Sequence, residues 1–326
     1  MQGFTQRPAV AIVLFVIGMS LIPLNDSFVR MMSEGMPTGQ FISFRSVIVI
    51  GLALMLPSTL RQLLTLTRSQ LLLLSVRGVV MGMALLLLFI SVVLIPLSTA
   101  YGIFFTSPAM ITLAGFFLFG ERPTAFKIAS IFLGFGGAIL ILEPWISGEG
   151  QQGFDWLAVS LSFAAACFYT IHQLITRSFG TSVDPTAALC LQQTWMGITS
   201  IIATIVVVLG YPLLASLFGP AEAASVDFGR LDFLAQDWIL PDWSQRLILL
   251  GCAMIAGFML WAGTNVYFVV PASVAAVFEY ASLPASVFWG FLIFRDPVSW
   301  FDPLGIVCIT LGGLLVAFGE RRSKGK

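Results

Sequence analysis

The stretch PLSTAYGIFFTSPAMITLAGFFLFGERPTAFKIASIFLGFGGAILIL, residues 96–142, decides the predicted fold. It consists of two long apolar runs joined by a short charged turn, GERPTAFK. Each run is close to the roughly 20 mostly apolar residues that a membrane-spanning helix needs. A related stretch, PASVAAVFEYASLPASVFWGFLIFRDPVSWFDPLGIVCITLGGLLVAF, follows at residues 271–318. The chain therefore contains the same two-helix pattern twice.

The two stretches match at a constant offset of 175 residues, and the helices before them match at an offset of 148. The first set of pairs is Pro96/Pro271, Ala100/Ala275, Ser107/Ser282, Phe116/Phe291, Phe119/Phe294 and Glu121/Asp296. The second set is Asn25/Gln173, Pro37/Pro185, Thr38/Thr186 and Arg45/Gln193. The offset changes because of an insertion at about residues 211–244. Such a repeat indicates two copies of one module, which is typical of membrane transporters.

The composition predicts a chain that is solvated mostly by lipid. Hydrophobic residues make up 58% of it and charged residues only 10%, against about 25% charged residues in soluble domains. The formal net charge is zero, so no electrostatic argument favours a nucleic-acid partner. The four cysteines lie in apolar runs without paired metal-ligand spacing, and no catalytic or nucleotide-binding motif is visible. We therefore expect no enzyme activity and no cofactor.

The hydropathy pattern predicts ten membrane-spanning helices, five in each half. They are expected near 9–32, 39–57, 70–94, 97–119, 126–143, 154–178, 185–210, 246–268, 271–294 and 303–319. The first repeat is predicted at 1–146, the second at 153–320, and a basic cytoplasmic tail at 321–326. Because each half has an odd number of helices, the two repeats are inverted relative to each other. The fold class is therefore all-α membrane protein with two inverted five-helix repeats.

The distribution of lysine and arginine predicts the orientation in the membrane. If the N-terminus is cytoplasmic, ten arginines and lysines lie on the cytoplasmic side and four on the outer side. Positive residues are enriched in cytoplasmic loops. We therefore expect a multi-pass protein of the inner (plasma) membrane with both termini in the cytoplasm.

Four ionisable residues stand out inside predicted spans: Asp26, Arg45, Arg77 and Glu279. Ionisable side chains cost several kcal/mol at the middle of a membrane, so each is a functional candidate. At 1.5 Å per residue, Asp26 and Arg45 share the outer half and Arg77 and Glu279 share the inner half. Two oppositely charged pairs are therefore geometrically feasible.

Two interpretations of these residues stay open. In the first, they line a polar cavity together with the aromatic residues Tyr101 and Tyr280. The arginines would then bind a substrate carboxylate, while Glu279 or Asp26 would bind an amine or carry a coupling proton. In the second, the charged residues form structural pairs between helices, or the arginines extend to the membrane surfaces.

Several motifs identify a family resemblance that covers nearly the whole chain. They are DSFVR (26–30), MPTGQFISFRS (36–46), Arg77-Gly78, FYTIHQLITR (168–177) and VFEYASLPASVFWGFLIF (277–294), together with residues 96–121. The chain resembles the drug/metabolite transporter superfamily, specifically the EamA-type ten-helix carriers. It departs from the family pattern at Val277, which replaces a proline, and at Arg295-Asp296-Pro297, which replaces Gly-Glu-x-Pro.

The resemblance implies a secondary transporter that works by alternating access, with the two repeats rocking around a cavity. We expect an exporter of amino acids or related small metabolites, with proton coupling through Glu279 as a further hypothesis. The alternative within transport is a carrier of S-adenosylmethionine or a nucleoside-like solute. From other classes, a lipid-modifying membrane enzyme or a non-transporting membrane subunit stays open. The expected partners are a small-molecule substrate and the lipid bilayer, and a homodimer is one open arrangement.

Overall fold

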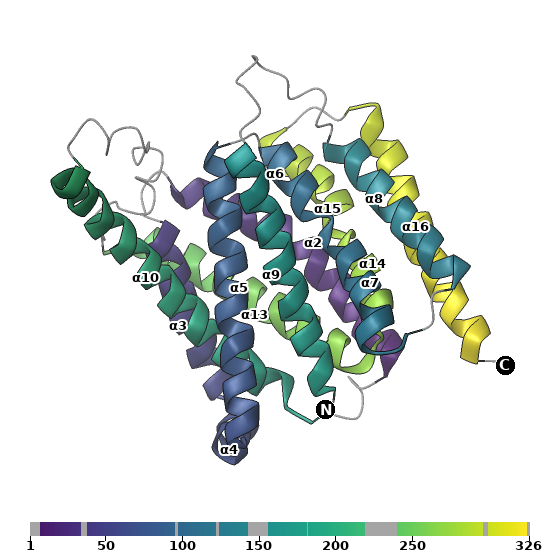
Figure 1. Cartoon of the computed structure of the whole chain (residues 1–326), viewed down its shortest axis with the longest axis horizontal. Helices are drawn as coiled ribbons and strands as arrows, with labels where there is room; N and C mark the ends of the chain where they lie inside the picture. The colour runs from purple at the N-terminus through teal and green to yellow at the C-terminus, as the bar shows by residue number, and fades with distance from the viewer. Residues whose placement is uncertain are drawn as a thin grey trace.

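The structure, a computed structural model, describes residues 7–33, 38–94, 97–121, 124–142, 156–180, 182–218, 240–295 and 299–324. Every regular element in these ranges is a helix (Figure 1). The first half contains α2 (Pro8–Ser33), α3 (Thr38–Leu54), α4 (Pro57–Thr65), α5 (Arg68–Leu94), α6 (Leu97–Phe104), α7 (Ser107–Leu118) and α8 (Ala125–Leu142). The second half contains α9 (Trp156–Phe179), α10 (Pro185–Phe218), α13 (Trp243–Val269), α14 (Ala272–Glu279), α15 (Ser282–Trp289), the π-helix η2 (Gly290–Phe294) and α16 (Phe301–Lys324).

The helices agree with an all-α membrane protein. By length and apolar composition, six of the described helices or broken helices could cross a membrane, or seven if the bent pair α3–α4 is one span. The helices α8 and α16 are also apolar but shorter. Within the described residues, each of the ten predicted ranges is mostly helical, while the number of crossings stays a prediction.

Two predicted segments outside the spans differ from the expectation. Of the insertion at 211–244, residues 211–218 continue helix α10, and residues 219–239 lie outside the described part of the chain. The predicted tail at 321–326 is helical as far as Lys324, because α16 extends beyond its predicted end.

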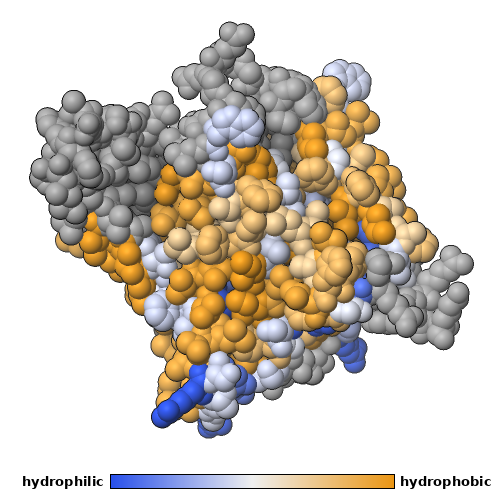
Figure 2. Space-filling view, viewed as in Figure 1, coloured by the Kyte–Doolittle hydropathy of each residue, from blue (hydrophilic) through white to orange (hydrophobic). Residues whose placement is uncertain are grey.

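The surface of the bundle carries many exposed apolar side chains. Phe117 is 80% exposed, Phe132 74% and Leu72 69%. Figure 2 shows hydrophobic residues over the middle of one face, with hydrophilic residues gathered at its lower end near α4. A soluble protein rarely exposes so large an apolar area, whereas a helix that faces lipid tails presents apolar side chains to them.

Two predicted spans, 97–119 and 271–294, are each broken in the middle. The helix α6 ends at Phe104 and α7 begins at Ser107, while α14 ends at Glu279 and α15 begins at Ser282. Proline explains both breaks, because it lacks an amide hydrogen and its ring clashes with the carbonyl four residues earlier. Pro108 is four residues after Phe104, and Pro284 is four residues after Tyr280. The breaks lie at equivalent positions, since 104 and 279 differ by 175.

The most extensive packing joins helices from different halves of the chain. The helix α8 packs along α16, α5 along α9, α3 along α10, and α2 along α13. Figure 1 shows the first two of these pairs as neighbouring ribbons. The two halves are therefore interleaved within one bundle.

Residues at equivalent positions of the two halves meet at the contacts between them. A Cβ atom on Gly137 would lie 2.7 Å from the carbonyl oxygen of Gly305, and one on Gly312 would lie 3.0 Å from that of Ser130. An offset of 175 relates 130 to 305 and 137 to 312, so these two contacts exchange equivalent residues. Such an exchange is the property of a two-fold interface. The repeat boundaries at 1–146 and 153–320 stay predictions.

Candidate functional site

The centre of the candidate site is the carboxylate of Glu279, at the C-terminal end of α14. The residue is 4% exposed. Its Oε1 atom accepts hydrogen bonds from the hydroxyl of Tyr267 at 2.5 Å, the hydroxyl of Tyr169 at 3.1 Å and Nε2 of Gln173 at 3.1 Å. Tyr267 belongs to α13, whereas Tyr169 and Gln173 lie one turn apart on α9. Three helices therefore converge on one carboxylate oxygen.

Glu279 is a buried carboxylate whose hydrogen-bond partners are all neutral groups. No arginine or lysine of the described residues forms an ion pair with it. Burial of an ionised carboxylate is costly unless it is paired, and three hydrogen-bond donors offset only part of that cost. The site is therefore able to accept a proton or a positively charged group of a ligand. Within the described residues no group of three His, Cys, Asp or Glu side chains could hold a metal ion.

Arg77 lies deep in the same bundle, with an exposed fraction of 1%. Its Nε atom donates to Oγ1 of Thr176 at 2.6 Å, and Nη2 donates to Oγ1 of Thr264 at 2.7 Å. Nη1 donates to the carbonyl oxygen of Ala188 at 3.2 Å. The acceptors are neutral and come from α9, α13 and α10. Arg77 thus links four helices and does not form the ion pair with Glu279 that its predicted depth allowed.

One face of α9 connects the surroundings of Glu279 and Arg77. Tyr169, His172, Gln173 and Thr176 lie three or four residues apart, so they follow one helical stripe. Nδ1 of His172 lies 3.1 Å from the carbonyl oxygen of Arg77. Because a carbonyl oxygen only accepts, Nδ1 carries the hydrogen, and Nε2 is the acceptor in the neutral ring.

Aromatic rings from both helix breaks form a cluster that includes Tyr169, whose hydroxyl donates to Glu279. The ring centroids of Phe104 and Tyr169 are 5.2 Å apart. Phe105 and Tyr280, at equivalent positions of the two breaks, stack with centroids 6.0 Å apart, and the Tyr280 hydroxyl donates to the Phe105 carbonyl oxygen at 3.2 Å. Tyr101 packs edge-on against Phe104 at 6.5 Å. The predicted residues Tyr101 and Tyr280 therefore belong to one aromatic cluster beside Glu279.

The remaining two predicted residues are placed differently. The guanidinium of Arg45, in α3, lies 5.8 Å from the ring centroid of Phe41, a cation–π contact. Asp26 belongs to α2, but its side chain lies outside the part that the structure describes. Their predicted pairing, and a role for Asp26 in proton coupling, stay predictions.

Sequence reasoning missed Tyr169 and Tyr267 as partners of Glu279. Tyr267 lies only 12 residues before Glu279, and Tyr169 precedes the amide Gln173 by one helical turn. The available signal was this i, i+4 spacing of polar groups in an otherwise apolar run.

Comparisons with known proteins give the family context of this site. Residues 9–143 match the model of the EamA-like transporter family. A riboflavin transporter of Vibrio cholerae serotype O1 is 24% identical over 233 residues, which are 70% of this chain and 65% of that protein. A riboflavin transporter of Rhizobium johnstonii is 25% identical over 232 residues, 71% of this chain and 65% of that protein. The aligned region thus spans slightly less than two thirds of each relative.

A solved crystal structure shares the fold over nearly the full length. Its TM-score is 0.69 at 16% sequence identity, and the match covers 97% of this chain and 98% of the other. At this identity the likeness concerns the arrangement of helices alone.

Proposed function

We propose that this chain, whose residues 9–143 match the EamA-like transporter family, transports a planar heteroaromatic metabolite of the flavin or nucleoside class. Transport is the activity of that family. The substrate class is our proposal, and it corresponds to the alternative that the sequence left open beside amino acids.

The observation that carries this proposal is the aromatic cluster beside Glu279, a carboxylate that forms no ion pair with a described arginine or lysine. Phe104, Phe105, Tyr169 and Tyr280 pack against one another, and the Tyr169 hydroxyl donates to Glu279. Stacking a base on an aromatic side chain contributes roughly 1–3 kcal/mol per base, and a carboxylate accepts from the ring N–H groups of such heterocycles. Two relatives that are described as riboflavin transporters support the same class.

Amino-acid export remains a second candidate because no arginine or lysine in the described part of the chain forms an ion pair with Glu279. A substrate ammonium group would supply that charge. In the amino-acid hypothesis the arginines bind the substrate carboxylate. Arg77, however, already donates to three acceptors within the bundle. We therefore rank this class second.

For the transport movement we propose two bodies that each contain helices from both halves. The most extensive helix pairs, α8 with α16, α5 with α9, α3 with α10 and α2 with α13, each join the first half to the second and would move together. This grouping replaces the simpler expectation that each repeat moves as a unit. The breaks at 105–106 and 280–281 contact each other through the stacked rings of Phe105 and Tyr280.

The test of the substrate class is a transport assay in proteoliposomes. Vesicles would be loaded with riboflavin, adenosine, S-adenosylmethionine and amino acids at equal concentration, and mass spectrometry would follow their efflux. Selective efflux of a heteroaromatic compound, competed by its analogues, supports the proposal. Selective efflux of amino acids would replace it by the second candidate.

Proton coupling through Glu279 is tested in the same vesicles. Glu279→Gln keeps the size of the side chain and removes its charge. If Glu279 carries the coupling proton, the variant still exchanges substrate but no longer responds to a pH gradient. An unchanged response to the gradient would reject this role.

A further inference from the structure

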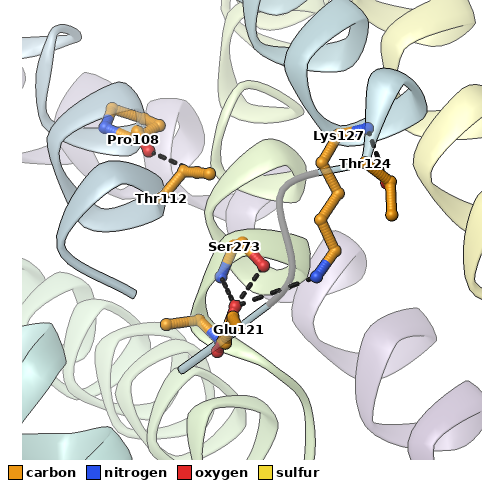
Figure 3. Close-up of polar contacts among 7 residues, drawn as sticks. Pro108, Thr112, Glu121, Thr124, Lys127 and Ser273 are labelled. Carbon is orange, nitrogen blue, oxygen red and sulfur yellow. Dashed lines mark hydrogen bonds and ion pairs between the residues drawn. The ribbon is translucent and has the colours of Figure 1, made fainter. Parts of the chain in front are cut away.

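A second carboxylate, Glu121, joins the end of the first broken span to the beginning of the second (Figure 3). Its side chain is 7% exposed. Oε1 accepts a hydrogen bond from the backbone N–H of Ala272 at 2.7 Å, and Oε2 accepts from the N–H of Ser273 at 3.1 Å. The hydroxyl of Ser273 also donates to Oε2. We call this group of contacts the Glu121 bridge.

The bridge has a clear physical cause. The first N–H groups of a helix have no partner inside it, and together they carry a partial positive charge. Ala272 and Ser273 are the first two residues of α14, and their N–H groups are satisfied by a carboxylate from 151 residues earlier. Nζ of Lys127 lies 4.0 Å from Oε2, a longer and weaker contact. The bridge therefore depends mainly on the α14 N–H groups and the Ser273 hydroxyl.

The helix that Glu121 holds also carries the candidate site. The helix α14 has eight residues, so it is about 12 Å long. Glu121 binds its first turn, and Glu279 is its last residue. The break after Glu279 separates α14 from α15, so the position of Glu279 depends on how α14 is held against α7.

We propose that Glu121 is a positioning residue for transport. It holds α14, and with it Glu279, against α7 in the state that this structure represents. The bridge separates in each cycle, when that end of the molecule opens. This inference rests on the proposed transport function, since it assigns a moving contact to the same site. Glu121 itself contacts no substrate.

The first test is a reversible cross-link beside the bridge. A Cβ atom on Gly115 would lie 3.7 Å from the Cβ of Ala272, within the 3.5–4.5 Å that disulfides span. The pair Gly115→Cys and Ala272→Cys would be made in a chain whose four natural cysteines are replaced. Oxidation should reduce transport by at least about tenfold and reduction should restore it. The two single variants should not respond to the oxidant.

A cross-linked protein that transports at the rate of the reduced one would overturn the inference. Formation of the disulfide is checked by mass spectrometry of the tryptic fragments, so that incomplete oxidation is not mistaken for this result.

The second test removes the charge of Glu121. In Glu121→Gln, the amide places a donor near an N–H group of α14, so the bridge weakens. The labelling rate of Ala272→Cys by a water-soluble maleimide should then rise by roughly tenfold, as expected when one charge-assisted hydrogen bond is lost. A change in stability alone would not expose this buried position in folded protein. Unchanged labelling would overturn the bridge.

The matched control is Asp242→Asn, another change from carboxylate to amide at a helix N-terminus. Asp242 caps its own helix, α13, by accepting from the N–H of Gln245 at 2.8 Å, and this bond lowers the pKa of its carboxyl. The Asp242→Asn substitution should leave the labelling rate at position 272 unchanged. If the wild-type chain moves no substrate, that result counts against the proposed function and not against the Glu121 bridge, because the labelling test needs no transport.

Discussion

Arg295 adopts a backbone conformation that glycine would occupy more easily. Its φ angle is 56°, at the end of η2, and Gly120 at the end of α7 has a φ of 62°. The two positions differ by 175 residues, so they are equivalent in the repeat. The left-handed conformation costs a residue with a Cβ atom roughly 1–2 kcal/mol.

We therefore expect Arg295→Gly to stabilise the protein. Part of the gain is lost because glycine is more flexible in the unfolded chain, so the net increase in unfolding free energy should be about 0.5–1 kcal/mol. Thermal unfolding in detergent measures it. The control is Arg295→Ala, which removes the same side chain and keeps the Cβ atom. Equal melting temperatures for the two variants would contradict this explanation.

Individual residues of the site were only partly predictable from the sequence. Glu279 and Arg77 stand out because a charged residue within an apolar run is visible without a structure. Their partners are not visible, because the rotation of each helix decides which groups meet. Arg77 therefore binds two threonine hydroxyls and a carbonyl oxygen, although pairing by charge and depth favoured Glu279.

At the scale of elements, α8 packs closely against the second helix break because Gly134 has no side chain. A Cβ atom on Gly134 would lie 2.5 Å from Cδ2 of Tyr280, which is too close without a shift of the ring. Gly136, two residues later, has no atom within 4 Å of such a Cβ. The two glycines thus provide a matched comparison on one helix.

We expect Gly134→Ala to destabilise the protein by about 1–3 kcal/mol through overpacking. It should also slow transport, because Tyr280 would move away from Phe105. Gly136→Ala should be neutral or stabilising by up to about 1 kcal/mol, because alanine favours helix. Unfolding and transport assays on both variants test this. Similar losses from both would show that the Tyr280 contact is not the cause.

The break between α6 and α7 should depend on Pro108. In Pro108→Ala the new N–H group can donate to the carbonyl oxygen of Phe104, so the two helices should join. We expect slower amide hydrogen exchange near residue 108 and slower transport, because the joint becomes stiffer. Pro57→Ala is the control, since Pro57 is the first residue of α4, where proline is well tolerated. Unchanged exchange and transport in Pro108→Ala would argue against this cause of the break.

The elements themselves were largely predictable, apart from these breaks. Apolar runs located the helices because lipid requires both length and hydrophobicity. The breaks were missed although both prolines are visible, because proline is tolerated inside many membrane helices. The interruption of helix at residues 105–106 and 280–281 is therefore visible only in the structure.

At the scale of the whole molecule, interleaving makes each half dependent on the other. The strongest helix pairs all join the segment 8–142 to the segment 156–324. Residues 1–150 and 151–326 expressed separately should therefore each be degraded or aggregate. Expressed together, they should assemble into a transporting complex, as measured by co-purification and efflux.

A control for this experiment uses the intact chain with a protease site inserted near residue 150. Cleavage after folding should leave the complex and its transport intact. A first half that remains soluble in detergent and folded by itself would contradict the dependence that the packing implies.

The contacts of Arg77 have a consequence for biosynthesis. Its three acceptors all lie later in the chain, and Thr264 follows it by 187 residues. At about 5–20 residues per second, a ribosome needs roughly 10 to 40 s to reach that position. Until then the nascent chain carries a guanidinium whose set of three partners is incomplete. The helix that carries Arg77, α5, must therefore be held in the translocon, at the membrane surface or by an insertase until the later helices are made.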